Sequence, residues 1–330
     1  MKLLITGGSG FIGSHVVRAA LGRGDQVLNI DCETYAASDA SVLHEWFQGD
    51  YQHIKENITN RAAMRAAIFD FTPDAILHLA AESHVDNSIS SPAEFVDTNL
   101  VGTSVLLDEA LRFWRDTGAN AAFRFLHVST DEVFGALGAD GRFDEGSNYQ
   151  PNSPYSASKA GSDMLARAYF KTYGLPVLIS NCSNNYGPNQ HDEKLIPTII
   201  RKSFEGDEIP IYGSGENIRD WLYVGDHIDA LFRQLDAAKP GAQYLVGGGT
   251  EITNLKLAEK LRDMIIAQFP NSKATGSNVA FVQDRAGHDF RYAIDASKIE
   301  RDLGWTAQTQ MDAGLHDTIT WYAQKYGALE

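Results

Sequence analysis

The fold is decided by the stretch LLITGGSGFIG, residues 3–13. Its apolar start predicts a short buried strand, and its glycines predict a turn into a helix that ends near Arg23. Glycines 8, 10 and 13 match GxGxxG, whereas glycines 7, 10 and 13 match the related GxxGxxG. Both patterns give a tight turn, a close approach of the backbone to a pyrophosphate and close packing of the helix on a sheet. We therefore expect a dinucleotide site here.

An acidic residue after the next strand indicates which dinucleotide binds. The strand predicted at 26–30 runs into Asp31, which lies 18 residues beyond Gly13. This is close to the spacing expected of a carboxylate that binds the ribose hydroxyls. Because a negative charge there repels a 2′-phosphate, we expect NAD rather than NADP.

Strand and helix patterns alternate along the first half of the chain. Further strands are predicted at 53–56, 75–79, 125–128 and 177–180, and helices near 61–71, 92–117, 153–173 and 193–205. Such alternation is typical of βαβ units. We therefore predict an α/β fold with a Rossmann-type doubly wound parallel sheet.

The pattern loosens after Cys182, which indicates a smaller, interleaved C-terminal substrate lobe. Its candidate segments are a loop at 184–188, a strand-like run at 209–213 and a basic, aromatic run at 218–223. Residues 226–235 and 244–246 are expected to return to the large sheet. The predicted division is an NAD-binding domain at 1–183 with 221–247, and a second, substrate-binding lobe at 184–220 and 248–330.

Composition excludes several classes of protein. The formal net charge of −15 argues against nucleic acid, which binds through Lys and Arg, and against an anionic membrane surface. No apolar run approaches the ~20 residues of a membrane helix, and no signal peptide opens the chain, so we expect no membrane association and a cytoplasmic protein. Cys32 and Cys182 lie far apart without CxxC or His-rich spacing, so we expect reduced thiols and no metal site.

Two residue pairs between 125 and 159 suggest acid–base chemistry. Tyr155 and Lys159 are four apart in a predicted helix, so the ammonium can favour the phenolate and let the tyrosine act as a base below its free pKa of about 10. Asp131 and Glu132 follow a strand end, where open α/β sheets bind ligands. An exposed helix face or a solvated turn would use the same residues, but the adjoining cofactor site favours catalysis.

With these features, the chain resembles the extended short-chain dehydrogenase/reductase superfamily and, within it, the dTDP-glucose 4,6-dehydratases. The resemblance runs nearly from end to end. It rests on the glycine turn and on motifs at 79–86, 129–133, 153–159, 181–188, 219–224 and 284–289. The discriminating motif is Thr130-Asp131-Glu132, because sugar-nucleotide epimerases usually lack the adjacent acid pair.

The resemblance implies a three-stage reaction that leaves the NAD unchanged. Tyr155, aided by Thr130, takes the proton of the glucosyl 4-hydroxyl as hydride passes from C4 to NAD. Glu132 then removes the C5 hydrogen while protonated Asp131 helps the 6-hydroxyl to leave as water, and hydride returns to C6. Lys159 is expected to orient the nicotinamide ribose and to lower the pKa of Tyr155.

The resemblance also assigns binding residues. Those expected along the NAD are Gly7, Gly10, Phe11, Ile12, Gly13, Asp31, Thr34, Asn57, Ile58, Leu79, Ala80, Ala81, Thr98, Tyr155, Lys159 and Asn185. Those expected around the sugar nucleotide are Ser83, Thr130, Asn184, Lys194, Leu195, Pro210, Tyr212, Arg219, Asn254, Asp284, Arg285 and His288.

Several of these residues also have simpler interpretations. Arg219 and Arg285 suit a diphosphate held bidentately, but either would equally serve in a surface ion pair. Asn254 suits a helix N-cap. For His84 and His288 we expect a structural, hydrogen-bonded role.

Three positions depart from the family pattern. Asn57 stands where an acid usually lies near the adenine, although its carbonyl oxygen can still accept a hydrogen bond. Cys32 replaces the usual lysine after Asp31, which is expected to loosen the adenosine ribose pocket. Phe134 replaces a common tyrosine, and we expect the loss of that hydroxyl to be tolerated.

The expected function is therefore that of a dTDP-glucose 4,6-dehydratase that acts as a homodimer. The alternatives are a UDP-glucose 4,6-dehydratase, a nucleotide-sugar 4-epimerase or decarboxylase, or a scaffold that binds both ligands without turnover. The helices near 92–117 and 153–173 are expected to pair with a second copy, although they could also cover only their own sheet.

Overall fold

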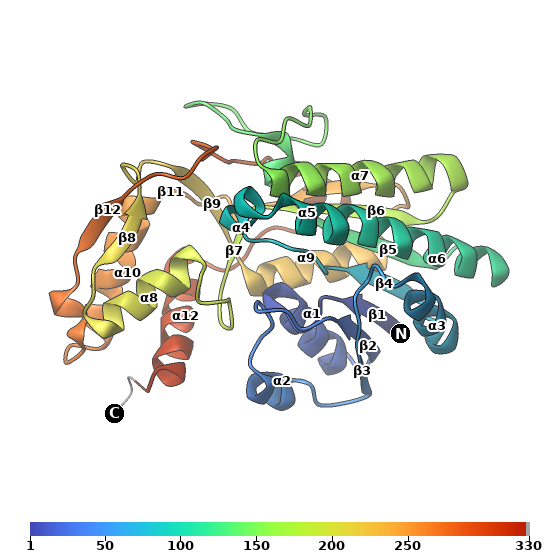
Figure 1. The fold of residues 1–330 in the computed structure, drawn as a ribbon, viewed down its shortest axis with the longest axis horizontal. Coiled ribbons are helices and arrows are strands. Elements are labelled where there is room, and N and C mark those ends of the chain that lie inside the picture. Colours follow the sequence, from blue (N-terminus) through green and yellow to red (C-terminus); the bar gives the residue numbers. More distant parts are fainter. Residues whose placement is uncertain (328–330) are drawn as a thin grey trace.

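The computed structural model describes residues 1–327 and has a seven-stranded sheet at its centre (Figure 1). The strand order is β10-β6-β5-β4-β1-β2-β3, and every neighbouring pair is parallel. The strands are β1 (Lys2–Thr6), β2 (Gln26–Asp31), β3 (Tyr51–Lys55), β4 (Ala75–His78), β5 (Arg124–Thr130), β6 (Val177–Cys182) and β10 (Gln243–Val246). This order confirms the predicted doubly wound sheet, which binds ligands beyond the carboxyl ends of its strands.

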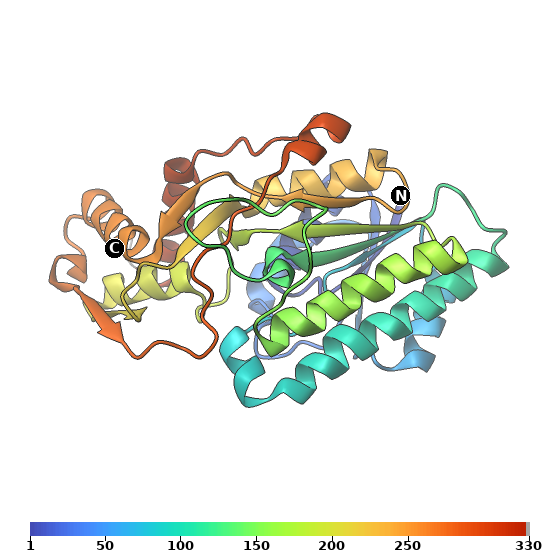
Figure 2. The ribbon, with the colours of Figure 1, turned by 90° about the horizontal axis from the view of Figure 1, so that it is seen from above.

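Helices cover both faces of the sheet (Figure 2). One layer contains α1 (Phe11–Gly22), α9 (Val224–Ala237) and α11 (Ser297–Leu303), and the other contains α3 (Arg61–Phe71), α6 (Thr103–Asp116) and α7 (Pro154–Tyr173). Successive strand residues point to opposite faces. In β1, Leu3 and Ile5 therefore pack in the first layer, and Leu4 packs in the second.

The single helix predicted at 92–117 is wrong in one respect, because the structure divides it into three. α5 (Pro92–Phe95) leads into a π-helical segment, η1 (Val96–Gly102), before α6 begins. The Asn99 side chain in η1 accepts a hydrogen bond from the Glu82 amide (2.9 Å) and donates to the Glu82 carbonyl (3.0 Å) and the Ser158 hydroxyl (2.9 Å). The π-helical segment thus ties the loop after β4 to α7.

A second, smaller core lies beside the large sheet. It contains two small sheets, one in the order β11-β9-β7 and one that pairs β12 with β8. Its elements are β7 (Asn184–Tyr186), α8 (Leu195–Glu205), β8 (Ile209–Tyr212), β9 (Ile218–Tyr223), β11 (Glu251–Thr253), α10 (Asn254–Gln268), η3 (Lys273–Gly276), β12 (Val279–Val282) and α12 (Met311–Lys325). Between β9 and β11 the chain returns to the large sheet as α9 and β10, so the two parts are interleaved.

Three short helices lie in the loops that follow strands of the large sheet. They are α2 (Ala40–Trp46) after β2, α4 (Val85–Ser90) after β4, and the 3-10 turn η2 (Asp131–Phe134) after β5. The sequence does not predict α2 or α4, both of which have fewer than eight residues.

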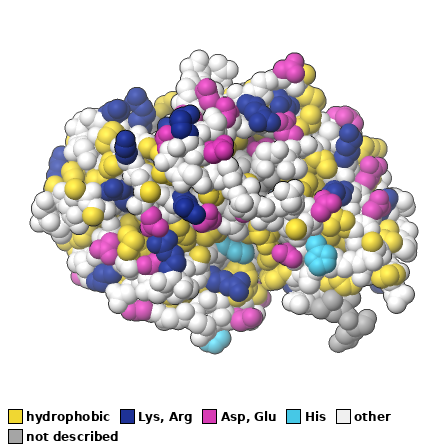
Figure 3. Space-filling view, turned by 180° about the vertical axis from the view of Figure 1, so that it is seen from behind, with side chains coloured by type: hydrophobic (Ala, Val, Ile, Leu, Met, Phe, Trp, Pro, Cys, Tyr) yellow, Lys and Arg dark blue, Asp and Glu magenta, His cyan; other side chains and the backbone are white. Residues whose placement is uncertain are grey.

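Acidic and basic side chains are interspersed on the face drawn in Figure 3. No helix within residues 1–327 is long and apolar enough to cross a membrane. The same residues contain no group of three or more His, Cys, Asp or Glu side chains that could hold a metal ion.

Candidate active site

The glycine turn between β1 and α1 leaves no room for side chains. Gly7 has a φ of +76°, and a Cβ there would lie 2.6 Å from the Ala80 amide nitrogen. A Cβ on Gly13 would lie 1.9 Å from the Gly7 carbonyl oxygen. Gly10 is the N-cap of α1, and because glycine has no side chain, it leaves the amides of the first turn without a side-chain cap. The helix start therefore has the geometry and free amides that a pyrophosphate requires.

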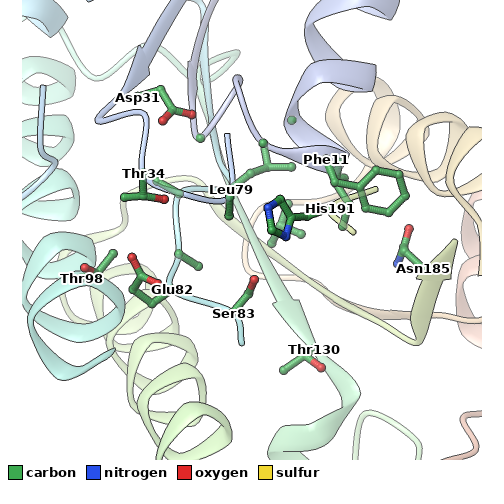
Figure 4. A pocket seen from close by; sticks show the side chains of 18 of the residues that line it. Phe11, Asp31, Thr34, Leu79, Glu82, Ser83, Thr98, Thr130, Asn185 and His191 are labelled. Carbon is green, nitrogen blue, oxygen red and sulfur yellow. The ribbon is translucent and has the colours of Figure 1, made fainter. Parts of the chain in front are cut away.

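Asp31 is held against this turn from the end of β2. Its carboxylate accepts hydrogen bonds from the Ser9 amide (2.9 Å) and the Glu33 amide (2.7 Å). In Figure 4, Asp31 lies near one end of the pocket and Thr130 near the other. A dinucleotide whose ribose binds Asp31 would extend along the glycine turn toward the acid pair after β5.

All sixteen residues expected along the NAD line a single cavity at the carboxyl ends of the strands. Among the residues expected around the sugar nucleotide, Ser83, Thr130, Asn184 and Lys194 line the same cavity. The site therefore fits a dinucleotide with a second ligand at its far end.

The cavity also has lining residues that the sequence did not indicate. They come from loops after strands and from strand ends, and include Ala36, Ala37, Glu56, Glu82, Ser183, Gln190, His191 and Glu193. Glu82 and Ser183 lie within the motifs at 79–86 and 181–188, so membership of these motifs was an available signal for both. The other six belong to no motif, and nothing in their spacing indicates a ligand.

Asp131 is a buried carboxyl at the start of η2. It is 1% exposed, and its Oδ2 atom has no hydrogen-bond partner among the described residues. Burial raises the pKa of Asp131 well above its ordinary value, and the charges of Glu132 and Asp220 raise it further. The raised pKa favours the protonated form of Asp131, which the acid of an elimination requires.

Glu132 has a different environment, although it is the next residue. Its side chain lines the cavity, whereas Asp131 does not. Burial raises the pKa of Glu132 above its ordinary value, and the positive charges of Arg285, Arg219 and Lys194 offset part of that shift. The surroundings thus give the two carboxyls different pKa shifts, which suits Asp131 to the role of an acid and Glu132 to the role of a base.

Tyr155 and Lys159 lie on the face of α7 that meets β5. Ser153 and Ser156 form a capping box at the helix start, with Pro154 in the first turn, which fixes the backbone around Tyr155. The Lys159 ammonium donates a hydrogen bond to the Val128 carbonyl (2.8 Å). Both side chains line the cavity.

The pKa of Tyr155 is raised, whereas the sequence predicts that Lys159 lowers it. Burial raises it well above its ordinary value, as do the Glu132 and Cys182 charges, whereas a hydrogen bond with Thr130 lowers it. The main lowering influence is thus Thr130 rather than Lys159, whose ammonium is directed at the Val128 carbonyl. Desolvation therefore outweighs the hydrogen bond with Thr130.

The remaining substrate-lobe candidates lie outside the lining of the cavity: Leu195, Pro210, Tyr212, Arg219, Asn254, Asp284, Arg285 and His288. Several join the two parts of the molecule through Asp86 of α4. Tyr212 donates to its Oδ2 atom (3.3 Å), and Arg285 lies 3.7 Å from Oδ1. Lys194 similarly donates to the Ser83 carbonyl (3.0 Å). These contacts bring basic side chains of the smaller part toward Glu132.

The simpler interpretations of four residues can now be compared with their surroundings. Arg219 is 5% exposed, stacks 4.4 Å from the Tyr292 ring centroid and donates to backbone carbonyls, so it is not a surface ion-pair partner. Asn254 is not the N-cap of α10, because Thr253 caps it. His84 caps α4 through Nδ1, and His288 lies 2.6 Å from Asp284, so both have structural contacts.

The three departures from the family pattern also have local explanations. The Asn57 carbonyl oxygen accepts from the Thr59 amide and hydroxyl, so it serves its own turn. Phe134 is buried and stacks on Phe143, where a hydroxyl is not needed. Cys32 is an exposed free thiol beside Asp31 on the cavity wall.

The fold and this site define a class: a dinucleotide-dependent enzyme of the short-chain dehydrogenase/reductase type with an additional acid–base pair. A sequence profile described as GDP-mannose 4,6 dehydratase matches residues 4–318. The chain belongs to this family of nucleotide-sugar 4,6-dehydratases.

Individual relatives cover almost the whole chain. A probable dTDP-glucose 4,6-dehydratase from Sinorhizobium fredii is 48% identical over 98% of this chain and 93% of the relative. dTDP-glucose 4,6-dehydratase 1 from Escherichia coli K12 is 46% identical over 98% and 92%. The crystal structure of a dTDP-glucose 4,6-dehydratase from Streptomyces venezuelae, solved with NAD bound, has a TM-score of 0.89 and 41% identity over 100% of this chain and 99% of that chain.

Proposed function

We propose that this enzyme converts dTDP-glucose to dTDP-4-keto-6-deoxyglucose and water. The observation that carries the proposal is the contrast between two adjacent carboxyls: Asp131 is buried with a pKa well above its ordinary value, and Glu132 lines the cavity near three cations. Oxidation at C4 alone needs no such pair. The names of the full-length relatives support the same reaction.

The cofactor that suits this site is NAD. When bound, it takes hydride from C4 of the sugar and later returns it to C6, so it is not consumed. The glycine turn and the amides of α1 hold the pyrophosphate, and Asp31 holds the adenosine ribose. Lys159 donates to the ribose of the nicotinamide half, next to Tyr155.

The protein side chains move the protons of each stage. Tyr155 takes the proton of the 4-hydroxyl, Glu132 takes the proton of C5, and Asp131 gives a proton to the departing 6-hydroxyl, which leaves as water. Glu132 then returns its proton to C5 as hydride reaches C6.

One proton must then pass from Tyr155 to Asp131 to restore the starting state. The Thr130 hydroxyl forms a hydrogen bond with each of these groups, including one to the Asp131 Oδ1 atom at 3.3 Å. We assign to Thr130 both the support of Tyr155 and this return path.

The proposal is tested by incubating the NAD-loaded protein with dTDP-glucose. The expected result is a 4-keto-6-deoxy product, which is detected by its absorbance in strong alkali, with no net NADH. Formation of a 4-epimer without dehydration would replace the proposal by a 4-epimerase, and binding without turnover would replace it by a scaffold. Parallel reactions with UDP-glucose and with N-acetylamino sugars test the preference for thymine and for glucose.

We also propose that the enzyme is a homodimer that works in the cytoplasm. Support for the dimer comes from apolar side chains exposed on η1 and α7, among them Val101 (45% exposed) and Met164 (57%). The two helices pack closely, since a Cβ on Gly161 would lie 3.0 Å from Leu100. Two copies would bury these side chains by pairing α6 and α7. Reducing surroundings suit the free thiols of Cys32 and Cys182.

A further inference from the structure

Asp163 lies on the same face of α7 as Tyr155 and Lys159. Asp163 lies four residues beyond Lys159, and side chains at this spacing fall on one face of a helix. Asp163 is 1% exposed and Lys159 is 4% exposed. The catalytic face of α7 therefore carries a buried cation and a buried anion one turn apart.

Side chains from β5, from β6 and from the loop before α7 hold the Asp163 carboxylate in place. Its Oδ2 atom accepts hydrogen bonds from the Asn181 amide of β6 (2.8 Å) and from the Tyr149 hydroxyl (2.9 Å). Its Oδ1 atom lies 3.1 Å from Nε2 of His127 on β5. Burial raises the pKa of Asp163, but the hydrogen bond from His127 and the charge of Lys159 oppose this effect, and the pKa lies below the ordinary value. The group is thus an ionised carboxylate inside the protein.

The other titratable groups packed around the pair are uncharged near neutral pH. Burial, aided by the Lys159 charge, lowers the pKa of His127, and burial raises the pKa of Cys182 to about 12. The pKa values of Tyr149 and Tyr155 are raised by burial. Burial lowers the pKa of Lys159, and the strongest opposing influence is Asp163.

We propose that Asp163 is a positioning residue that keeps Lys159 in its charged form beside Tyr155. A buried ammonium without an opposite charge loses its proton readily. The Val128 carbonyl, the hydrogen-bond acceptor of Lys159, carries no formal charge. Asp163 touches neither ligand site, and it acts on the 4-hydroxyl proton transfer through Lys159. This inference rests on the proposed function.

Replacing the charge should change the pH dependence of turnover. In Asp163→Asn the Lys159 pKa falls, so the lysine becomes neutral as the pH rises, and activity is lost from the alkaline side. We expect the alkaline limb of kcat for dTDP-glucose to move down by roughly 1–3 pH units, the effect of one nearby opposite charge. Asp163→Glu, which restores the charge, should return the limb toward its original position.

Tyr149→Phe is the matched control, because it removes one hydrogen bond to the same carboxylate but keeps the charge. Its alkaline limb should coincide with that of the unaltered enzyme. A purely structural Asp163 would lower the melting temperature in both variants and leave both limbs in place. An unshifted limb in folded Asp163→Asn overturns the inference. If that variant does not fold, Asp163→Ser, which leaves room for water, replaces it.

A measurement on the unaltered protein gives an independent test. The side-chain ¹⁵N signal of Lys159 should report an ammonium throughout the pH range of full activity. Deprotonation within that range overturns the inference. Absence of dTDP-glucose turnover would instead contradict the proposed function, and the NMR titration would still decide the state of Lys159.

Discussion

At the scale of single residues, Asp131 and Glu132 show how burial sets the roles of chemically similar side chains. Asp131 is buried and does not line the cavity, and its Oδ2 atom lacks a hydrogen-bond partner among residues 1–327. Glu132 lines the cavity near Arg219, Arg285 and Lys194. Two carboxyls that share a peptide bond can therefore hold and release protons in different pH ranges.

The base role proposed for Glu132 predicts a selective loss in Glu132→Gln. The variant should bind dTDP-glucose and oxidise C4, because Tyr155 and Lys159 are intact. Exchange of the C5 hydrogen with heavy water should fall by about 10²–10⁴-fold, the usual contribution of a general base. NMR of recovered sugar nucleotide measures the exchange, and exchange at the original rate would remove Glu132 from this role.

The raised pKa of Asp131 predicts a stability that depends on pH. Stability linked to its protonated form is fully present below the ordinary aspartate pKa of about 4 and is lost as the pH rises toward the raised value. Asp131→Asn should not lose stability in this way, because its amide has no proton to release over this pH range. Its melting temperature should match that of the unaltered protein near pH 4 and exceed it by a few degrees near pH 7, as about 1–2 kcal/mol would produce. A constant difference across this range would contradict the linkage.

Individual residues also show where sequence reasoning stops. The positions of Tyr155, Lys159 and Glu132 at one cavity follow from their motifs, and Asp131, the residue before Glu132, is buried without lining the cavity. The direction of the Tyr155 pKa shift does not, because it depends on how much water the folded protein excludes. The cap of α10 falls on Thr253 instead of Asn254, since both residue types favour that position.

At the scale of elements, the π-helical segment η1 could not be predicted. The apolar spacing of residues 92–117 is that of one long helix, and the departure arises from tertiary hydrogen bonds of Asn99 to Glu82 and Ser158. Thr98, which lines the cavity, lies in this segment. Local widening of a helix is frequent at functional sites. Here the segment carries Thr98 and, through Asn99, holds the backbone of Glu82, and both Thr98 and Glu82 line the cavity.

The turn between β1 and α1 was predictable, and it offers a sharp comparison within one helix. Gly13→Ala places a methyl group 1.9 Å from the Gly7 carbonyl, which should cost about 1–3 kcal/mol of stability and abolish NAD retention. Gly22→Ala, in the same helix, meets no heavy atom within 4 Å among the described residues and should stabilise by about 0.5–1 kcal/mol. Denaturant titration and measurement of bound NAD distinguish the two, and equal behaviour would contradict the steric argument.

At the scale of the whole molecule, the large sheet and the existence of a smaller part with strands near 209–213 and 218–223 were predictable, but the pairing of strands within that part was not. Alternating strands and helices specify a parallel sheet, and even the return of residues 244–246 follows from their pattern. β7 and β11 have only three residues each, too few for a periodicity to appear. Their pairing with β9 depends on contacts between distant segments.

The proposed dimer makes a prediction about molecular mass. Met164→Glu places a charge on the exposed apolar face of α7 and should convert the protein to a monomer, as measured by sedimentation. Phe281→Glu is the control, because Phe281 is 59% exposed on β12, in the other part of the molecule. A Met164→Glu protein with unchanged mass would exclude pairing through this face.

The late return of α9 and β10 to the sheet has a consequence for synthesis on the ribosome. The nascent chain emerges with β1, α1 and β6 long before residues 222–246 exist to cover them. At about 5–20 residues per second, the flank of β6 and the apolar side of α1 stay open to water for a time on the order of seconds. Productive folding of the first half therefore awaits translation of the second.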